Sequence, residues 1–213
     1  MSPGSPNPKS SGISKRLAQR IAKQSRSEPG RVFTPFDFRD LGTPQSVGMA
    51  CLRLVREGNL RRLARGLYDV PRTHPLLGEL LPTAEAIAQA LARRDGAQIQ
   101  PMEAMAANLL GLSEQVPVKA MFLTDGPGHT VTVGPLTVQL KQRSLRQVGK
   151  AASTSSLVFA ALRGLGKDHI TRARVAHLRE TLNPKDRKRL LKDLPLAPAW
   201  MHPFLRYIAG EDA

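Results

Sequence analysis

Apolar residues recur every three or four positions between residues 12 and 26, which is the spacing of one helix face. Ile13, Leu17 and Ile21 form this stripe, and Lys and Arg occupy positions off it. The pattern predicts an amphipathic helix over 12–26. Residues 1–11 contain Pro, Gly and Ser without an apolar stripe, so we expect them to form a disordered tail.

Two start signals for helices follow this first helix. Thr34-Pro35 and Thr43-Pro44 each place an N-cap residue before a proline at the first helical position. The first signal predicts a short helix that ends at Gly42, and the second predicts a longer helix that ends at Gly58. Two short helices joined by a turn that contains glycine are the helix-turn-helix arrangement.

The longer helix has two different faces when it is drawn at 100° per residue. One face is apolar and is expected to be buried: Val47, Ala50, Cys51, Leu54 and Val55. The opposite face carries amide, hydroxyl and guanidinium groups, which read base edges and phosphates in a major groove. The residues of this helix that we expect to contact DNA are Thr43, Gln45, Ser46, Met49, Arg53 and Arg56.

The stretch NLRRLARGLYDV at 59–70 alternates well enough to predict two short strands with a turn at Gly66. A hairpin that follows a helix-turn-helix is the wing of a winged helix. Its arginines are expected to lie against the phosphate backbone or to enter the minor groove. These arginines are Arg61, Arg62 and Arg65.

The rest of the chain mixes helical and strand-like patterns. Residues 73–82 form a Pro-rich connector, and the segments from 83 to 111 are mainly helical. Strand-like stretches separated by Gly and Pro follow up to residue 143, and four helical stretches follow residue 153. The predicted fold class is α+β: a winged helix-turn-helix domain over 12–72, then an independent domain over 83–213 with a small sheet and a helical C-terminal end.

Composition and charge narrow the kind of partner. The net charge is +15, which favours an anionic partner. Residues 1–72 hold 14 Lys and Arg against 5 Asp and Glu, residues 73–140 hold 3 against 6, and residues 141–213 hold 15 against 6. No run of 18 apolar residues exists, and the single cysteine excludes an internal disulfide. We therefore expect a cytoplasmic protein with two basic ends and no membrane segment.

The basic end near the C-terminus has two interpretations. The stretch KDRKRLLKDL is most often a solvated helix face with its leucines turned inward. It is alternatively a second phosphate-binding patch formed by Lys185, Arg187, Lys188, Arg189 and Lys192. For the N-terminal block, the alternative to DNA is an RNA or an acidic protein surface. Readers of single-stranded RNA usually expose stacking aromatics, and Tyr68 is the only candidate there.

No catalytic or metal site is predicted. Asp125 and His129 lie in a Gly-rich loop, but a strand-like segment follows where a phosphate loop needs a helix, so a hairpin turn is the better interpretation. His169 and His177 lie eight residues apart on one predicted helix without a third ligand. Cys51 has no paired base for a nucleophile. We expect a protein that is not an enzyme and needs no cofactor.

Four stretches carry a resemblance to a known family: GRVFTPFDFRDLG, ACLRLVREGNLRRLARGLYDVP, AANLLGLSEQVPVKAMFLTDGP and RKRLLKDLPLAPAWM. In this order, over roughly residues 13–208, the chain resembles the AbiEi antitoxins of type IV toxin-antitoxin (abortive infection) systems, in their full-length winged-helix branch. The resemblance implies a DNA-binding N-terminal domain and a C-terminal antitoxin domain. It also implies that the protein represses its own operon by binding double-stranded operator DNA. The expected binding site consists of inverted repeats.

The same resemblance implies a functional partner, a nucleotidyltransferase-like toxin that is counteracted without a stable complex, and a role in phage defence. The nucleotidyltransferase signature itself, a Gly-Ser followed by spaced aspartates, is absent from this chain. The alternatives are a plain plasmid or phage transcriptional regulator without a toxin partner, an RNA-binding protein, or an enzyme that processes nucleic acid.

Overall fold

The computed structural model describes residues 8–113, 119–143 and 154–211. The chain divides into two units, one formed by Met1–Ala97 with His129–Val138 and the other by Gln98–Gly128 with Gln139–Ala213. We call them the N-terminal and the C-terminal unit. This boundary differs from the expected connector at 73–82, because residues 83–97 pack with the N-terminal unit. Whether residues 12–72 and 83–213 fold independently stays a prediction.

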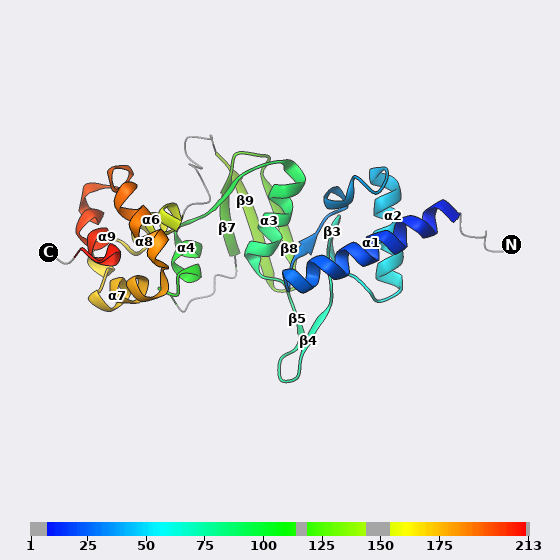
Figure 1. Ribbon diagram of the computed structural model, residues 1–213, viewed down its shortest axis with the longest axis horizontal. Coiled ribbons are helices and arrows are strands. Elements are labelled where there is room, and N and C mark those ends of the chain that lie inside the picture. The colour runs from blue at the N-terminus through cyan, green and yellow to red at the C-terminus, as the bar shows by residue number, and fades with distance from the viewer. Residues whose placement is uncertain (1–7, 114–118, 144–153, 212–213) are drawn as a thin grey trace. The chain divides into compact units, whose positions relative to one another are not determined.

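Helices and a small sheet alternate at the start of the N-terminal unit (Figure 1). In order, the elements are the helix α1 Pro8–Ser27, the strand β1 Val32–Phe33, the 3₁₀ helix η1 Pro35–Phe38, the helix α2 Pro44–Arg56, and the strands β2 Arg61–Ala64 and β3 Leu67–Asp69. The strands form one antiparallel sheet in the order β1-β3-β2. The structure confirms a short helix that begins at residue 35, a longer helix that begins at residue 44 and a hairpin within 59–70, but the first of these helices ends at Phe38 and not at Gly42.

The first helix begins earlier than the sequence pattern predicts. Residues 8–11, expected to belong to the disordered tail, form the first turn of α1, and proline is tolerated there because the first amides of a helix have no partner within it. The remaining tail, residues 1–7, lies outside the described residues. Leu17 and Ile21 of α1 are buried with Phe33, Phe38 and the apolar face of α2 in one core.

The predicted connector forms a second hairpin. Strands β4 Arg72–His74 and β5 Gly78–Leu80 pair antiparallel, and the hairpin extends away from the helices of its unit (Figure 1). Its prolines lie outside both strands, so they remove no hydrogen bond from the ladder. The helix α3 Ala84–Asp95 follows, begins at an N-cap formed by Thr83, ends at Gly96, and packs against β1 and η1.

The remaining strands build a four-stranded sheet. They are β6 Ile99–Pro101, β7 Lys119–Thr124, β8 His129–Val133 and β9 Leu136–Gln142, in the order β6-β7-β9-β8. Because β9 lies between β7 and β8, the predicted hairpin turn at 124–130 is wrong: this segment joins two strands that are not neighbours. The alternative interpretation of this segment as a phosphate-binding loop fails as well, because the strand β8 follows it where such a loop needs a helix.

The C-terminal unit is mainly helical. Besides β6, β7 and the last residues of β9, its elements are the helices α4 Glu103–Leu109, α6 Thr154–Leu165, η2 Lys167–His169, α7 Arg172–Thr181, α8 Pro184–Lys192, η3 Leu194–Leu196, η4 Ala199–Met201 and α9 His202–Ala209. They enclose one core that includes Leu162, Leu178 and Leu205. Gly164 of α6 lies so close to Glu103 that an added Cβ would be 2.7 Å from the Glu103 side chain. The coarse fold class, α+β with small sheets and C-terminal helices, is confirmed.

Candidate nucleic-acid interface

The helix α2 is fixed at its start by its own polar side chains. Thr43 Oγ1 accepts a hydrogen bond of 3.2 Å from the Ser46 amide, and Ser46 Oγ donates one of 2.9 Å to the Thr43 carbonyl. The first of these bonds satisfies an amide at the helix start that has no partner within the helix. Thr43 and Ser46 were predicted to contact DNA, and in the structure their hydroxyl groups serve the cap of α2.

The solvent-exposed stripe of α2 is formed by Gln45, Met49 and Arg56. Met49 is 47% exposed, whereas Val47 and Leu54 on the opposite face are at most 2% exposed. Gly48 lies beside the stripe, and an added Cβ would meet nothing within 4 Å. Within the described chain, Gln45 and Arg56 make no hydrogen bond or ion pair, so both are available to a ligand.

Arg53 lies differently from what the helical wheel predicts. Its Nη1 donates a hydrogen bond of 3.3 Å to Ser14 Oγ on α1, and its side chain is half-buried. The expected outward orientation toward DNA is therefore not found. The wheel gives the direction of a residue about its own helix, but it cannot show that α1 covers that side of α2.

Arg61 is turned into the protein. Its Nε and Nη2 donate to the two carboxylate oxygens of Asp69 at 2.9 and 2.6 Å, its Nη2 reaches the Leu80 carbonyl at 2.8 Å, and Nη1 pairs with Glu79 at 2.8 Å. The hydrogen bond with Asp69 raises the pKa of Arg61. Arg61, predicted to contact phosphate, instead joins β2 to β3 and to the second hairpin, and it neutralises the buried carboxylate of Asp69.

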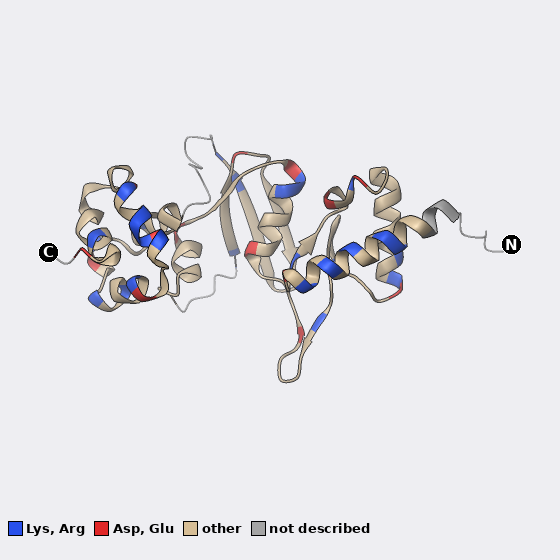
Figure 2. Ribbon diagram, in the orientation of Figure 1, with Lys and Arg blue, Asp and Glu red and all other residues tan. Residues whose placement is uncertain are grey.

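The neighbouring arginines of the hairpin face solvent. Arg62 lies next to Arg61 in β2 and therefore points to the opposite face of the strand, and Arg65 lies in the turn before Gly66, whose φ of 74° suits glycine. Both are exposed, and neither has a hydrogen bond or ion pair with any residue that the structure describes. Figure 2 shows further Lys and Arg along α1 and on α2 of the same unit.

The chemistry of Cys51 does not suit a nucleophile. Its side chain is 2% exposed in the core below α2, and burial raises the pKa of its thiol to about 11. A thiol with this pKa is protonated at neutral pH, and the thiolate is the reactive form. Among the described residues, no group of three His, Cys, Asp or Glu side chains is arranged to hold a metal ion.

The predicted second basic patch is only partly assembled. Lys185, Lys188, Arg189 and Lys192 line an open hollow of about 980 Å³ on α8, together with Asp186 and Asp193. Arg189 Nε lies 3.3 Å from Asp193 Oδ2, so this pair is neutralised locally. Arg187 is half-buried and does not line the hollow. Leu190 is fully buried below them, as the interpretation of α8 as a solvated helix face requires.

The histidines take structural positions. His169 lies in η2 and His177 in α7, because Thr171 begins a new helix between them, so the predicted single helix is wrong. His177 Nε2 donates to the Leu110 carbonyl at 3.1 Å. His129 and Arg94 bind Asp95 at 2.7 and 2.8 Å. Burial raises the pKa of Asp95, but the hydrogen bonds from Arg94 and His129 outweigh it and hold the pKa below its ordinary value.

A second group of arginines, Arg31, Arg72 and Arg93, was not singled out by the sequence. These residues lie up to 62 positions apart, and they meet beside the turn that follows α1. No periodic pattern links positions in a turn, a strand and a helix. The excess of Lys and Arg over Asp and Glu in residues 1–72 was the one available signal, and it does not show where in the fold arginines come together.

The fold and these surfaces define an α+β protein with a strongly basic, solvent-facing region in its N-terminal unit. The chain belongs to the DUF6088 family, described as a family of unknown function, which matches residues 16–190. No curated protein matches the sequence. In the described part of the chain, no helix is both long and apolar enough to cross a membrane.

Proposed function

We propose that the N-terminal unit is a winged-helix domain that binds double-stranded DNA in a sequence-specific way. In this proposal α2 enters the major groove with Gln45, Met49 and Arg56, and the β2–β3 hairpin lies on the phosphate backbone with Arg62 and Arg65. The order of elements supports it: a helix, a short 3₁₀ helix, a second long helix and a hairpin share one core.

One observation carries the proposal: the exposed arginines of α2 and of the β2–β3 hairpin have no acidic partner in the described chain. Arg56, Arg62 and Arg65 each leave a guanidinium group open to solvent, and Arg56 shares the exposed face of α2 with the amide of Gln45. Guanidinium groups bind phosphate as a planar fork, and an exposed glutamine amide matches the edge of adenine. Another exposed arginine of the same unit is paired within the chain, since Arg20 of α1 forms an ion pair with Asp40.

Double-stranded DNA fits this surface better than single-stranded RNA. Tyr68, the candidate for base stacking, is 4% exposed and belongs to the core. Phe36 is 39% exposed, but the guanidinium of Arg39 lies over its ring at 4.4 Å. In the described part of this unit, Tyr68 is therefore closed to a splayed base and one face of Phe36 is already covered, so the pair of open stacking rings typical of single-stranded RNA readers is not present.

The biological role in this proposal rests on the resemblance to AbiEi antitoxins. The protein represses its own operon through the N-terminal unit, counteracts a nucleotidyltransferase-like toxin through the C-terminal unit, and acts without enzymatic chemistry of its own. A plain regulator would share the first activity and lack the second.

Two readouts in cells test both activities in the full chain. One is a reporter driven by the region upstream of the chain's own gene, and the other is growth after induction of the neighbouring toxin gene. We expect the wild type to repress the reporter and to restore growth. The variant Arg62→Gln/Arg65→Gln should lose most of the repression and still restore growth, because the two activities lie in different units.

Each failure has a distinct meaning. A reporter that is unaffected by the wild type contradicts the DNA-binding proposal. Repression without any restoration of growth leaves the plain regulator and overturns the antitoxin role. Loss of both activities in the hairpin variant, with protein levels equal to the wild type, contradicts their division between the units.

A further inference from the structure

We infer that the N-terminal unit holds a second, separate site: a small anion pocket that binds a phosphoryl group of a small molecule. The pocket has a volume of about 370 Å³ and lies between the turn that follows α1, the start of β4 and the helix α3. Its cationic walls are Arg31, Arg72 and Arg93. None of the residues that line it belongs to α2 or to the β2–β3 hairpin.

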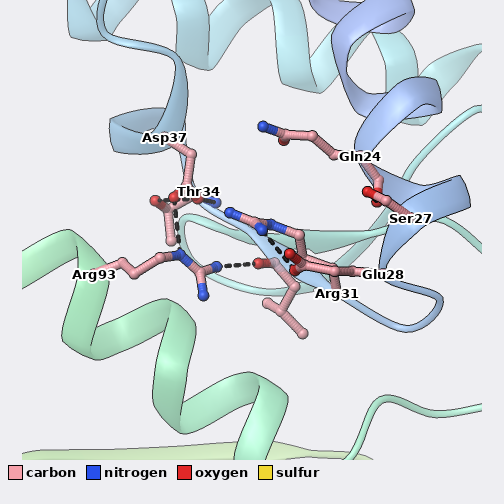
Figure 3. Close-up of polar contacts among 8 residues, drawn as sticks. Gln24, Ser27, Glu28, Arg31, Thr34, Asp37 and Arg93 are labelled. Carbon is pink, nitrogen blue, oxygen red and sulfur yellow. Dashed lines mark hydrogen bonds and ion pairs between the residues drawn. The ribbon is translucent and has the colours of Figure 1, made fainter.

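Two of the three guanidinium groups are balanced within the protein (Figure 3). Arg31 Nη1 lies 2.6 Å from Glu28 Oε2. Arg93 Nε lies 3.1 Å from Asp37 Oδ1, and its Nη2 donates to the Val32 carbonyl at 2.7 Å. Asp37 is held in place in turn by the amide and hydroxyl of Thr34, at 2.7 and 3.0 Å. Arg31 and Arg93 therefore have fixed positions and paired charges.

Arg72 is the group without a counter-charge. It is half-buried, its Nε is fully buried without a hydrogen-bond partner, and no described residue forms an ion pair with it. The Nε of Arg31 is buried and unpartnered as well. Burying a cation without an anion beside it is unfavourable. A bound anion would balance the charge of Arg72, which no described residue balances.

The backbone is shaped to hold Arg72 in this place. The guanidinium lies against Gly30, where an added Cβ would be 2.7 Å from Nη2 and 2.9 Å from the central carbon. Gly30 also has a φ of 85°, which other residues rarely adopt. The absence of a side chain at Gly30 therefore leaves room for the guanidinium of Arg72, the group that lacks a counter-charge.

Size and chemistry indicate the class of ligand. A guanidinium fork binds two phosphoryl oxygens at once. The volume lies at the lower end of the range for small-molecule sites, about 300–1,000 Å³. Exposed Thr83 and Gln89 at the rim leave the pocket open to solutes. A small phosphomonoester fits this site better than the backbone of a duplex.

Calorimetric titration of the full chain tests the inference, with inorganic phosphate and adenosine monophosphate as probes in chloride buffer of constant ionic strength. We expect one saturable site for each probe and none for adenosine. Arg72→Gln should weaken both probes at least about tenfold, because the unpaired fork is removed. Arg72→Lys, which keeps the charge but not the fork, should weaken them by a smaller factor. Arg163→Gln removes the same charge from an exposed position of the C-terminal unit and should change the affinities by less than about twofold.

Three outcomes would overturn the inference. The first is the absence of saturable binding to the wild type. The second is unchanged binding by an Arg72→Gln protein that melts at the wild-type temperature, which shows that Arg72 does not hold the anion. The third concerns the source of the phosphoryl group: if a duplex of random sequence displaces the probes, and Arg72→Gln lowers the affinity for that duplex by the same factor, the pocket is a DNA backbone contact.

Discussion

Replacing Arg62 and Arg65 by glutamine is expected to weaken the binding of every duplex, whatever its sequence, by about 10- to 100-fold at physiological salt. Both guanidinium groups are exposed on the β2–β3 hairpin and have no partner in the described chain. Each phosphate contact releases about 0.9 counterion, so the slope of log K against log salt should fall by about 2. Fluorescence anisotropy at four salt concentrations measures both quantities.

The matched control removes the same charge elsewhere. Arg163 and Arg172 are exposed arginines of the C-terminal unit, so Arg163→Gln/Arg172→Gln also lowers the net charge by two. This control should leave the affinity and the salt slope nearly unchanged. An equal loss in both double variants would mean that net charge attracts the DNA and that the hairpin has no specific contact with it.

Arg61 is expected to affect stability far more than its neighbours. Arg61→Met leaves the carboxylate of Asp69, which is fully buried, without its guanidinium partner. Breaking a buried pair on one side costs about 3–5 kcal/mol. Since Arg61 remains 17% exposed at its side chain, we expect the free energy of unfolding to fall by about 3 kcal/mol, at the lower end of that range. Urea denaturation followed by circular dichroism measures this change.

Two comparisons isolate the buried charge as the cause. Arg62→Met, at the adjacent but exposed position, should change the stability by about 0.5 kcal/mol or less. The double variant Arg61→Met/Asp69→Leu removes both charges and should recover most of the loss, because no unpaired carboxylate remains. A loss in Arg61→Met no larger than that in Arg62→Met would show that the Asp69 carboxylate does not need this partner.

The hairpin also shows which part of the site could be predicted from the sequence. Strand alternation requires Arg61 and Arg62 to point to opposite faces, but it does not say which of them points inward. The answer lies across the ladder, where Arg61 is opposite Asp69. Asp69 in an otherwise apolar strand was a usable signal for a buried pair. The additional bonds of Arg61 to Glu79 and Leu80 had no such signal, because residues 73–82 were expected to be an irregular connector.

Local capping signals predicted the elements more reliably than the contacts between them. Thr34-Pro35 and Thr43-Pro44 place the starts of η1 and α2, and Gly58 places the end of α2 within two residues, since a cap needs only neighbouring atoms. Arg53 and Arg93 show the limit of this reasoning. Their partners, Ser14 and Asp37, lie 39 and 56 positions away, and only the packed helices bring them together.

The central claim is that the exposed stripe of α2 reads base edges, and a specificity ratio tests it most directly. The ratio compares the dissociation constant for an unrelated duplex with that for a duplex from upstream of the chain's own gene, at one salt concentration. In Gln45→Ala it should fall by about 5- to 100-fold while the affinity for the unrelated duplex is unchanged, since a bidentate amide contact to adenine contributes about 1–3 kcal/mol. Gln19→Ala on the exposed side of α1 should keep the wild-type ratio. A wild-type ratio near one, or a Gln45→Ala ratio equal to the wild type, would contradict the account.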